Sequence, residues 1–592
     1  MNILTTDVLV VGCGPAGLTM ALGLARAGID VLAVAKHSGT ANSPRAHITN
    51  QRSMEAFRQL GVERAVAAAA VPNELMGNNV WSTSFADPEI GRMQAWGSGE
   101  KRRTDYDAAS PSKMCNIAQH IMEPVLLDAA VAEGARTRFR SEFLSLREVG
   151  DGVETRLRDR DTGEEFLVQS RFVIGADGAN SAVASSIGID FEGEMGLGAS
   201  VNAWLEVDLT QYTAHRPGVL YWMTRPGNDY WVGSGTWICV EPWKDWVMLF
   251  MYDPNGPEPD LSDEGIIARA RATIGDDSIP VRVKAVSKWQ INHVVASHYR
   301  IGRTFIAGDA AHRHPPANGL GTNTSVQDSF NLAWKLAMVI KGQASASLLD
   351  SYSAERQPVG RQVVDRAMKS VGGMRPIADA LGFRPEQSEA EGWASLEELR
   401  GDTQRGRERR EQLSKAIELQ NYQFNCHGVE MGQVYASDAI LPDGKSAPVP
   451  TRDAELFYHP STFPGGRLPH VWLEQDKRRI SSLDLCAWDG FTLLTGTGGT
   501  AWVDAASRVA PDCAIPLYAH RIGPACEVTD IYGDWSAISE VSDSGCVLVR
   551  PDHHIAWRCA DMPSDPAAAL ETVIRAIIGR AVAAERQLVA PR

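Results

Sequence analysis

The sequence has few cysteines, and none of them stands in a spacing that carries chemistry. Its nine cysteines are scattered over 592 residues, with no CxxC pair and no spacing typical of a metal site. An odd number of scattered cysteines is typical of reduced thiols in a cytosol rather than of a disulfide framework. We therefore expect a cytoplasmic protein with no metal site and no thiol redox chemistry.

Long basic stretches and uninterrupted apolar stretches are also missing. A net charge of -15 argues against nucleic acid or an anionic membrane as a partner. One apolar run, residues 8–25, raises the question of a membrane span, but Gly12, Gly14 and Pro15 would break a spanning helix near its start. The residues before this run include Asp7 and no Lys or Arg, unlike a signal peptide. The sequence predicts a soluble protein without a targeting segment.

The N-terminal stretch TDVLVVGCGPAGLTMALGLARAG predicts a strand, a glycine loop and a helix. In this G-x-G-x-x-G pattern Gly12 allows a tight turn, Gly14 lets the backbone approach a pyrophosphate, and Gly17 lets helix and strand pack closely. Pro15 and Ala16 complete the loop, and the helix N-terminus offers N–H groups to an anion. A glycine-rich turn in the core is the alternative. A second strand, IDVLAVAKH, follows and favours a dinucleotide-binding fold.

One part of that fingerprint is absent. An acidic residue usually follows the second strand and binds the ribose hydroxyls, but this strand ends in Val34-Ala35-Lys36. Asp30 comes too early in the chain to take that role. We expect Lys36 or Arg45 to hold the adenosine ribose instead.

Two further strands end in small-residue turns that carry one aspartate each. RFVIGADGANSAV leads into Asp177 and Gly178, and GRTFIAGDAAH leads into Gly308 and Asp309. An aspartate at the carboxyl end of a strand can reach a ligand that lies across the edge of the sheet. Either motif alone is common, whereas all three in this order form a specific signal.

With these motifs the chain resembles the single-component FAD-dependent aromatic hydroxylases, the family of para-hydroxybenzoate hydroxylase and phenol hydroxylase. Within that family it is similar to the chlorophenol monooxygenase and hydroxybiphenyl monooxygenase branch. The similar stretches run from the N-terminus almost to the C-terminus. They are SPRAHITNQRSMEAFRQLG, VPNELMGNNV, MQAWGS, GVLYWM, HRHPPANGLGTNTSVQDSFNLAWKLAMV, LLDSYSAERQPV and LPHVWL…ISSLDLC…FTLLTG.

The resemblance implies an enzyme with FAD as cofactor and NADPH or NADH as reductant. It implies that O2 is used to ortho-hydroxylate a substituted phenol to a catechol, in a homodimer or homotetramer. Three alternatives stay open: a hydroxylase of a larger phenolic or polyketide-like ring, a flavin oxidase or dehydrogenase without oxygen insertion, and a cofactor-holding interaction protein. Glu241 stands where we expect an arginine from near relatives, which leaves the choice between NADH and NADPH open.

The same resemblance assigns residues to FAD. Asp309 would bond the ribityl or ribose part, Pro315 and Pro316 would form a rigid wall beside the isoalloxazine ring, and Gln119 matches a position that contacts the cofactor. A helix that starts near Thr324 would stabilise negative charge on the reduced ring. His312 and His314 could suggest a metal, but no nearby Cys, Asp or Glu set completes a site, so we expect none. Backbone N–H groups toward the pyrimidine edge would come from Gly319, Leu320, Gly321, Thr322 and Asn323.

His47, in PRAHITNQR, is the candidate catalytic base. A phenol has a pKa of about 10, and losing its proton activates the ortho carbon, so a positioned base helps at neutral pH. A histidine titrates near neutrality and can accept that proton. The alternative is a loop histidine that contacts FAD or a carbonyl group. Arg45 suits FAD, because its planar fork matches a phosphate or a ring edge.

Aromatic residues are dense in the middle of the chain, where alternating stretches predict a sheet. Its buried face would line an apolar pocket for the substrate. Trp96, Tyr221 and Trp222 fall in the family-like stretches, and with Pro315 they are the pocket candidates. The full aromatic set is Trp96, Tyr221, Trp222, Tyr230, Trp231, Trp237, Trp243 and Trp246.

These patterns predict an α/β protein of about two to four domains. A Rossmann-like FAD-binding domain would comprise residues 1–75, 110–195 and 285–375, with a mixed or antiparallel substrate sheet inserted at 76–109 and 196–284. Residues 376–424, which are rich in charge, would form a solvated linking helix. Residues 425–592 would form a thioredoxin-like domain without CxxC, suited to dimer contacts.

Overall fold

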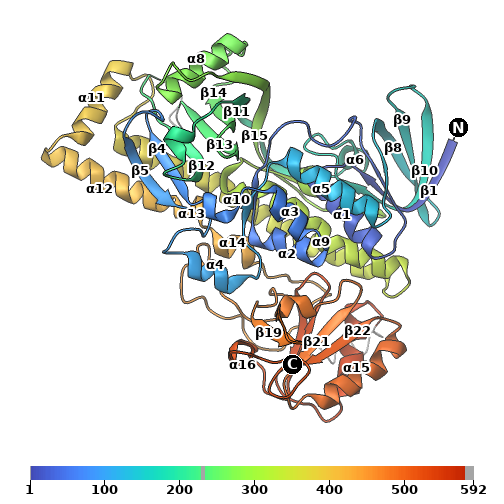
Figure 1. Cartoon of the computed structure of the whole chain (residues 1–592). Helices are drawn as coiled ribbons and strands as arrows, with labels where there is room; N and C mark the ends of the chain where they lie inside the picture. The colour runs from blue at the N-terminus through green and yellow to red at the C-terminus, as the bar shows by residue number, and fades with distance from the viewer. Residues whose placement is uncertain (1, 228–233, 581–592) are drawn as a thin grey trace.

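The computed structural model describes residues 2–227 and 234–580. Tyr230 and Trp231, counted above among the aromatic residues, lie outside the described residues. The chain forms two large sheets with a layer of helices between and below them, and a lobe made by its C-terminal part (Figure 1). The predicted α/β fold class is confirmed.

The first sheet has eight strands in the order β16-β17-β10-β1-β2-β7, with β8 and β9 continuing from β10. The strands from β17 to β7 pair in parallel, and helices α1, α5 and α9 cover them. Val8–Val11 are buried because this sheet is covered on both faces. The elements are β1 (Asn2–Val11), α1 (Pro15–Arg26), β2 (Val31–Val34), α5 (Gln119–Ala132), β7 (Arg136–Arg138), β8 (Ser141–Val149), β9 (Gly152–Asp159), β10 (Glu165–Gly175), β16 (Arg300–Ile301), β17 (Thr304–Ile306) and α9 (Gly321–Ile340).

The second sheet also has eight strands, in the order β18-β15-β11-β14-β13-β12-β4-β5. Its neighbours pair antiparallel except β12 with β4. Successive side chains point to opposite faces, so the sheet packs α8 on one face and the helices around α10 on the other. The elements are β4 (Asn78–Ser82), β5 (Glu89–Gln94), β11 (Phe191–Glu206), β12 (Gly218–Met223), β13 (Gly235–Glu241), β14 (Asp245–Tyr252), α8 (Asp263–Ile274), β15 (Arg282–Ala296) and β18 (His312–Arg313).

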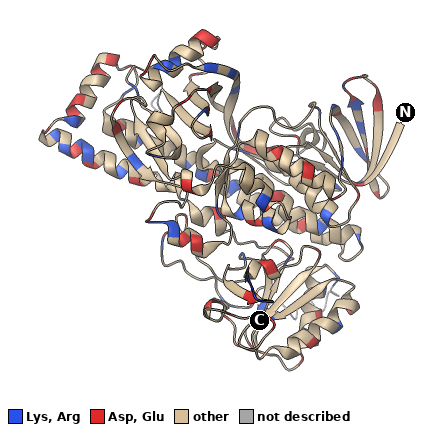
Figure 2. Cartoon of the chain, viewed as in Figure 1, with Lys and Arg blue, Asp and Glu red and all other residues tan. Residues whose placement is uncertain are grey.

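The charge-rich segment contains two helices where the sequence pattern predicts one. Helix α10 (Asp350–Leu381) continues past residue 376 and ends at Gly382, whose φ of 72° is a left-handed cap. Helices α11 (Glu389–Arg400) and α12 (Gln404–Leu419) then follow, and the side chain of Thr403 caps the second by accepting from the Gly406 N–H. Figure 2 shows both signs of charge along α11 and α12. Leu396 and Leu413 nevertheless lie in the core against the second sheet, so this segment is only half solvated.

The C-terminal lobe has a four-stranded sheet in the order β22-β21-β23-β24, in which only β21 and β22 are parallel. This βαβ unit followed by a hairpin and a helix is the thioredoxin-like arrangement expected from the sequence. The turn between β21 and α15 reads Gly496-Thr497-Gly498-Gly499 and holds no cysteine. The elements are β19 (Trp472–Gln475), β20 (Arg478–Ser481), β21 (Phe491–Thr495), α15 (Thr500–Cys513), β22 (Leu517–Arg521), α16 (Asp534–Ile538), β23 (Cys546–Val549), β24 (Ile555–Cys559) and α17 (Pro566–Ile577).

Shorter elements connect these layers. They are β3 (Ile48–Thr49), α2 (Gln51–Gln59), α3 (Glu63–Ala69), η1 (Asn73–Leu75), α4 (Arg103–Ala109), β6 (Cys115–Asn116), α6 (Ala182–Ser186), α7 (Thr210–Thr213), η2 (Gly308–Ala310), η3 (Ala317–Gly319), η4 (Ala346–Leu349), α13 (Asn421–Phe424), α14 (His427–Met431) and η5 (Ser482–Leu485).

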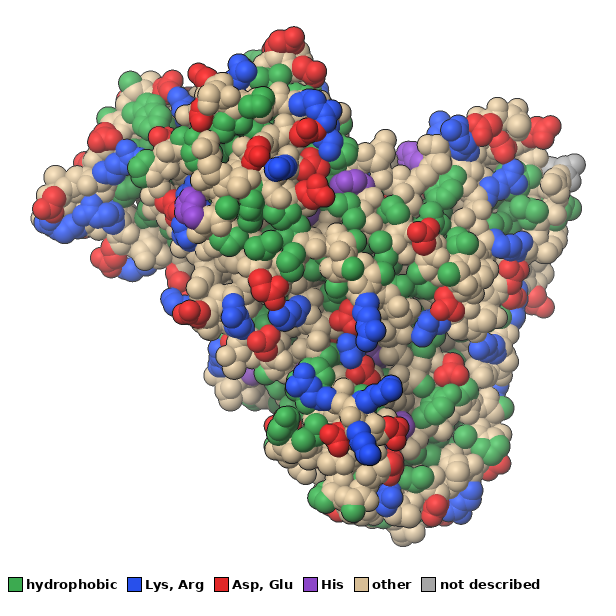
Figure 3. Space-filling view, in the orientation of Figure 1, with side chains coloured by type: hydrophobic (Ala, Val, Ile, Leu, Met, Phe, Trp, Pro, Cys, Tyr) green, Lys and Arg blue, Asp and Glu red, His purple; other side chains and the backbone are tan. Residues whose placement is uncertain are grey.

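The surface carries charge of both signs, and Figure 3 shows a hollow between the lobe with α8 and the lobe with β8 and β9. Within residues 2–227 and 234–580, no helix is long and apolar enough to span a membrane.

Candidate active site

The three aspartate and glycine motifs meet at one edge of the first sheet. Val11 pairs with Gly175 and with Val34, and Gly175 pairs with Ile306, so β1, β2, β10 and β17 end level with one another. The loops that follow bring Gly12, Ala176 and Gly308 together. We call this set of loops the strand-end site. In open parallel sheets ligands bind at this carboxyl edge.

Two glycines are required by close backbone approach. At Gly12, where φ is 117°, a Cβ atom would lie 2.0 Å from the Ala176 carbonyl oxygen. At Gly308, where φ is 65°, a Cβ atom would lie 2.8 Å from the Ser325 hydroxyl and 3.2 Å from Cβ of Ala16. The loop at Gly12 therefore lies against the loop at Ala176, and the loop at Gly308 lies against Ala16 at the start of α1. The three motifs are thus neighbours at one edge of the sheet.

The start of α1 is open to a ligand. Gly14 is its N-cap residue and supplies no side-chain cap, and Pro15 occupies the first turn. A Cβ at Gly14 would meet only Glu123 Oε1, at 3.8 Å, so the residue is not needed for packing. The free N–H groups of such a helix end suit a phosphate. Ala16 and Gly17 belong to this turn, and a Cβ at Gly17 would lie 1.9 Å from the Gly12 carbonyl oxygen.

The two motif aspartates are placed differently. Asp177 caps α6 by accepting from the Ser181 hydroxyl at 2.5 Å and from the Ala182 N–H at 2.8 Å. Its carboxylate is therefore committed to the protein, and contact with a cofactor would fall to the backbone near Gly178. Asp309, by contrast, is exposed at the strand-end site. Of the two motif aspartates, Asp309 is therefore the one whose carboxylate is left exposed at this edge.

The loop after β2 carries the two expected cations. Lys36 and Arg45 are both exposed, so both are free to reach a ligand. The loop is fixed by Glu123 of α5, whose Oε2 accepts from the Ala41 N–H at 2.5 Å. Gln119 donates to Glu123 Oε1 at 2.6 Å, so its amide is oriented by that carboxyl. Burial raises the pKa of Glu123.

Sequence reasoning missed Glu123. The only signal for it is the spacing of four residues from Gln119, which places both side chains on one face of the helix.

The second loop of the site runs from Pro315 to the start of α9. Pro315 is buried and Pro316 is exposed, while Gly319 has a φ of 63° and would place a Cβ 3.0 Å from Cβ of Ile48. Helix α9 begins at Gly321, three residues before the start expected at Thr324, and Leu320 at its N-cap supplies no side-chain bond. The N–H groups of the first turn, which includes Thr322, are thus left open.

Asn323 joins this loop to the segment that carries His47. Its amide nitrogen donates to the Ile48 carbonyl at 2.9 Å and to the Gly319 carbonyl at 2.6 Å. Its amide oxygen accepts from the Asn50 N–H at 2.9 Å. The side chain of Asn323 therefore fixes the distance between the glycine loop and residues 47–50.

His47 is half-buried beside this loop, and its tautomer follows from its neighbours. Asn116 Nδ2 donates to the Cys239 carbonyl at 2.8 Å, so Asn116 Oδ1 faces His47 Nδ1 at 2.9 Å and must accept. The proton of the neutral ring then lies on Nδ1, and Nε2 is left as an acceptor. Burial lowers the pKa of His47 to about 4, against a smaller rise from the Asn116 bond, so the ring is neutral at pH 7.

His312 and His314, which follow the Gly308-Asp309 motif, have separate surroundings. His312 is buried and bonds Asp328 Oδ2 at 2.9 Å, and the same oxygen accepts from the Gly308 N–H at 3.0 Å. Asp328, which sequence reasoning missed, thus holds the third motif in place, and Arg356 donates to its other oxygen at 2.7 Å. His314 Nδ1 donates to the Pro315 carbonyl at 2.6 Å, and its Nε2 has no partner among the described residues. Across residues 2–227 and 234–580, no group of three or more His, Cys, Asp or Glu side chains is arranged to hold a metal ion.

The aromatic candidates divide between the two faces of the second sheet. Trp222 stacks on Trp81, and both line a small cavity closed by Phe424 of α13. Trp96 packs its ring against Phe424 with centroids 5.5 Å apart, in the same cluster as Ile48. Tyr221 follows the alternation to the opposite face, where its ring is buried among the residues that pack on α8. The structure therefore brings Trp96 and Trp222, but not Tyr221, to the side that carries Ile48.

These features fit FAD when they are taken together. The open N-termini of α1 and α9 suit a pyrophosphate and a flavin edge, and the glycines at 12, 308 and 319 remove side chains that would fill the space between the loops. Exposed Asp309 and Arg45 add one group of each charge. Two separate uncapped helix starts suit an extended dinucleotide better than a single phosphate group.

Comparison with known proteins gives the same answer over nearly the whole chain. Residues 5–367 match the model of an FAD binding domain, and residues 461–581 match that of the C-terminal part of aromatic-ring hydroxylases. The chain is 46% identical to 2,4-dichlorophenol 6-monooxygenase of Cupriavidus pinatubonensis, over 97% of this chain and 96% of that protein. It is 42% identical to phenol 2-monooxygenase of a Pseudomonas species, over 97% of this chain and 93% of that protein.

A solved structure agrees in three dimensions. The flavin-dependent monooxygenase PieE, crystallised with FAD and substrate, superposes with a TM-score of 0.94 at 44% identity, covering 98% of this chain and all of that one. The resemblance drawn from the sequence motifs is confirmed. The chain is a member of the FAD-dependent aromatic-ring hydroxylase family.

Proposed function

We propose that the protein is a monooxygenase that uses FAD, O2 and NADPH or NADH to ortho-hydroxylate a substituted phenol to a catechol. The observation that carries this proposal is the open Nε2 of His47, a neutral acceptor beside the loop that suits the flavin edge. Support also comes from the chlorophenol and phenol monooxygenases that the chain resembles at 42–46% identity. We further propose a cytoplasmic homodimer or homotetramer.

FAD, when bound, supplies the reduction by nicotinamide and the reaction with O2. The chain would supply the rest. His47 Nε2 would accept the phenol proton, which makes the ring a better nucleophile at its ortho carbon. Burial lowers the pKa of free His47 to about 4, but the phenolate formed beside it would stabilise the protonated ring. Pro315, Trp96 and Trp222 exclude water and orient the ring. The open first turn of α9 would hold the flavin edge and stabilise negative charge there.

The test is a stoichiometric assay of the purified yellow protein. NADPH and then NADH are mixed with it, with and without a chlorophenol, and the nicotinamide absorbance, the catechol and hydrogen peroxide are followed together. We expect phenol-stimulated consumption of one reductant, matched one to one by catechol. Consumption that yields no hydroxylated product from any phenol tried, including larger two-ring phenols, would favour an oxidase. No consumption with either reductant would favour a non-catalytic role.

A further inference from the structure

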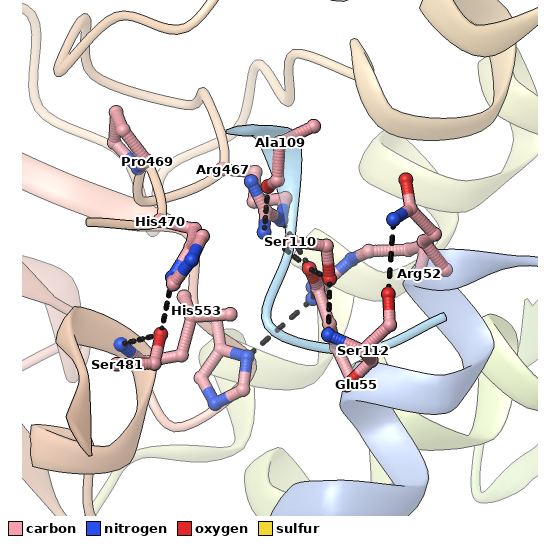
Figure 4. A network of polar contacts seen from close by, with 12 residues as sticks. Arg52, Glu55, Ala109, Ser110, Ser112, Arg467, Pro469, His470, Ser481 and His553 are labelled. Carbon is pink, nitrogen blue, oxygen red and sulfur yellow. Dashed lines mark hydrogen bonds and ion pairs between the residues drawn. The ribbon is translucent and has the colours of Figure 1, made fainter. Parts of the chain in front are cut away.

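A buried cluster of charge lies where the C-terminal lobe meets α2 (Figure 4). We call Arg52, Glu55, Ser110 and Arg467 the Glu55 cluster. Arg52 and Glu55 belong to α2, Ser110 follows α4, and Arg467 belongs to the C-terminal lobe, where its backbone bridges to His554. Glu55 is 0% exposed, Arg467 2%, and Arg52 and Ser110 5% each. The cluster is part of no cofactor-binding loop and no proposed catalytic step.

Every oxygen of Glu55 is bonded. Oε1 accepts from the Ser110 hydroxyl at 2.6 Å and from Arg467 Nη2, and Oε2 accepts from Arg467 Nε at 2.7 Å and from Arg52 Nη1 at 3.1 Å. The guanidinium of Arg467 therefore grips the carboxylate with two nitrogens. It also donates to the Ala109 carbonyl at 3.0 Å. A two-pronged arginine contact fixes direction as well as distance.

Glu55 is ionised in this setting at neutral pH. Burial raises its pKa, but Arg467, Arg52 and Ser110 outweigh burial and lower it to about 2. A buried charge without its partner is costly, so the carboxylate holds α2 where Arg467 can reach it. Only the C-terminal lobe supplies this partner, and its Asp552 carbonyl also accepts from Arg52 at 2.6 Å.

Helix α2 starts at the catalytic segment. Gln51, its first residue, donates to the Tyr106 and Ser112 carbonyls at 2.9 Å each. Asn50, its N-cap, is bonded through its backbone to Asn323, which also holds Ile48. His47 lies immediately before Ile48 in the chain. A tilt of α2 would thus move both His47 and the loop that begins α9.

We propose that Arg467 is a positioning residue: its grip on Glu55 sets α2, and α2 sets His47 and the glycine loop of α9 against the flavin. The C-terminal lobe would then influence the site that is built on the two large sheets. The inference rests on the proposed function only for the turnover measurement described next, because the cofactor measurements do not need a substrate.

The experiment compares Arg467→Lys and Arg467→Met with Arg558→Met. Arg558 is a matched control: its side chain is 5% exposed and it bonds Asp443 at 2.6 Å and Thr462 at 3.0 Å, within the C-terminal part of the chain and away from α2. For each full-length holoenzyme one measures the FAD dissociation constant, the absorption spectrum of bound FAD, and the product formed per reductant consumed. Arg467→Lys keeps the charge and loses the fork, so it carries the test if Arg467→Met does not fold.

We expect both Arg467 variants to bind FAD about tenfold more weakly and to shift the flavin bands, with Arg558→Met like the wild type. Misplacing a reacting group by about 1 Å can cost about a hundredfold in rate, so product per reductant should fall at least about fivefold, with hydrogen peroxide making up the difference. The proposal is overturned if the Arg467 variants match Arg558→Met in FAD affinity and spectrum. It is also overturned if Arg467→Lys equals the wild type in both. If the wild type hydroxylates no phenol, the proposed function fails while the FAD measurements still decide the role of Arg467.

Discussion

The strand-end site can be compared with the junction, by which we mean the contact of α2, α9 and α10 with the C-terminal lobe. Both gather polar side chains, but the side chains are open at the first and bonded at the second. At the strand-end site Asp309 and Arg45 are exposed, and the first turns of α1 and α9 have no side-chain caps. At the junction Lys335 and Arg550 each bond Glu355, and all three side chains are fully buried. The open groups are available to a ligand, and the closed ones hold helices α9 and α10 to the C-terminal lobe.

This contrast separates binding from scaffolding. A polar group that the protein leaves exposed is hydrated and stays available to a ligand, which can replace the water. A charge bonded on all sides has nothing left for a ligand, and its removal is felt as lost stability. Asp177 belongs to the second kind even though it stands in a cofactor motif, because α6 takes both of its oxygens.

The largest effect that we expect is a loss of stability in acid, caused by buried histidines at the junction. Burial lowers the pKa of His427, His553 and His554 to about 3 each. Because the unfolded chain binds these protons from about pH 6.5 downward and the folded chain does not, stability should fall steadily between pH 6.5 and 3. Denaturant unfolding at pH 7, 6, 5 and 4.5 measures it. His553→Gln should reduce the slope by about 1.4 kcal/mol per pH unit, and a stability that is flat from pH 6.5 to 4.5 would contradict the assignment.

Removing one partner of the closed network is the next largest effect. Arg550 donates to Glu355 at 2.6 Å and to Asp552 at 2.5 Å, with all three side chains at most 1% exposed. Arg550→Met should lower the free energy of unfolding by about 3–5 kcal/mol, because it leaves two buried carboxylates short of a cation. Lys415→Ala breaks the exposed pair with Glu411 and should cost less than about 0.5 kcal/mol. Equal costs for the two variants would show that burial does not set the contribution of these ion pairs to stability.

Removing an open group of the site should lower activity and leave stability unchanged. His47→Ala removes the free Nε2 and should lower phenol turnover about a hundredfold while the protein stays yellow with FAD. The flavin absorbance of the purified variant measures bound FAD, and steady-state product formation measures phenol turnover. His298→Ala, at an exposed histidine, is the control and should change neither. Normal turnover in the His47 variant with FAD bound would exclude His47 as the base.

The smallest effect should come from Gly14, where the fold needs no glycine. A Cβ there meets only Glu123 Oε1 at 3.8 Å, so Gly14→Ala should leave the unfolding temperature of the apoprotein unchanged. The added methyl group faces the expected pyrophosphate and should weaken FAD binding about tenfold, or about 1.4 kcal/mol. Gly28→Ala, just beyond the other end of α1, meets no atom within 4 Å but strains a φ of 73°, so it should lower the unfolding temperature and leave FAD affinity unchanged. An apoprotein destabilised by Gly14→Ala would place this residue in the scaffold instead.

Local patterns foretold one of the two regions well. The strands before Gly12, Asp177 and Gly308 were predicted to end in ligand loops, and they end level at one sheet edge. The thioredoxin-like lobe without CxxC was also predicted. The pattern failed where a short cap decides: Gly401, Asp402 and Thr403 divide one expected helix into α11 and α12. Tyr221 and Trp222 are neighbours on β12, so their side chains point to opposite faces of the sheet. Composition alone does not say which of the two faces the substrate side.

By itself the sequence determined the cofactor loops, since a glycine turn between a strand and a helix is specified by residues close together in the chain. It also determined the order of strands and helices from which the layers are built. Tertiary structure alone decided which polar groups stay open. Glu55 meets Arg467 across more than four hundred residues, and Asn323 reaches Ile48 across nearly three hundred. No local pattern encodes such pairs, because each forms only after the sheets and the C-terminal lobe have packed. Packing removes water from the charges of the junction and leaves those of the strand-end site hydrated.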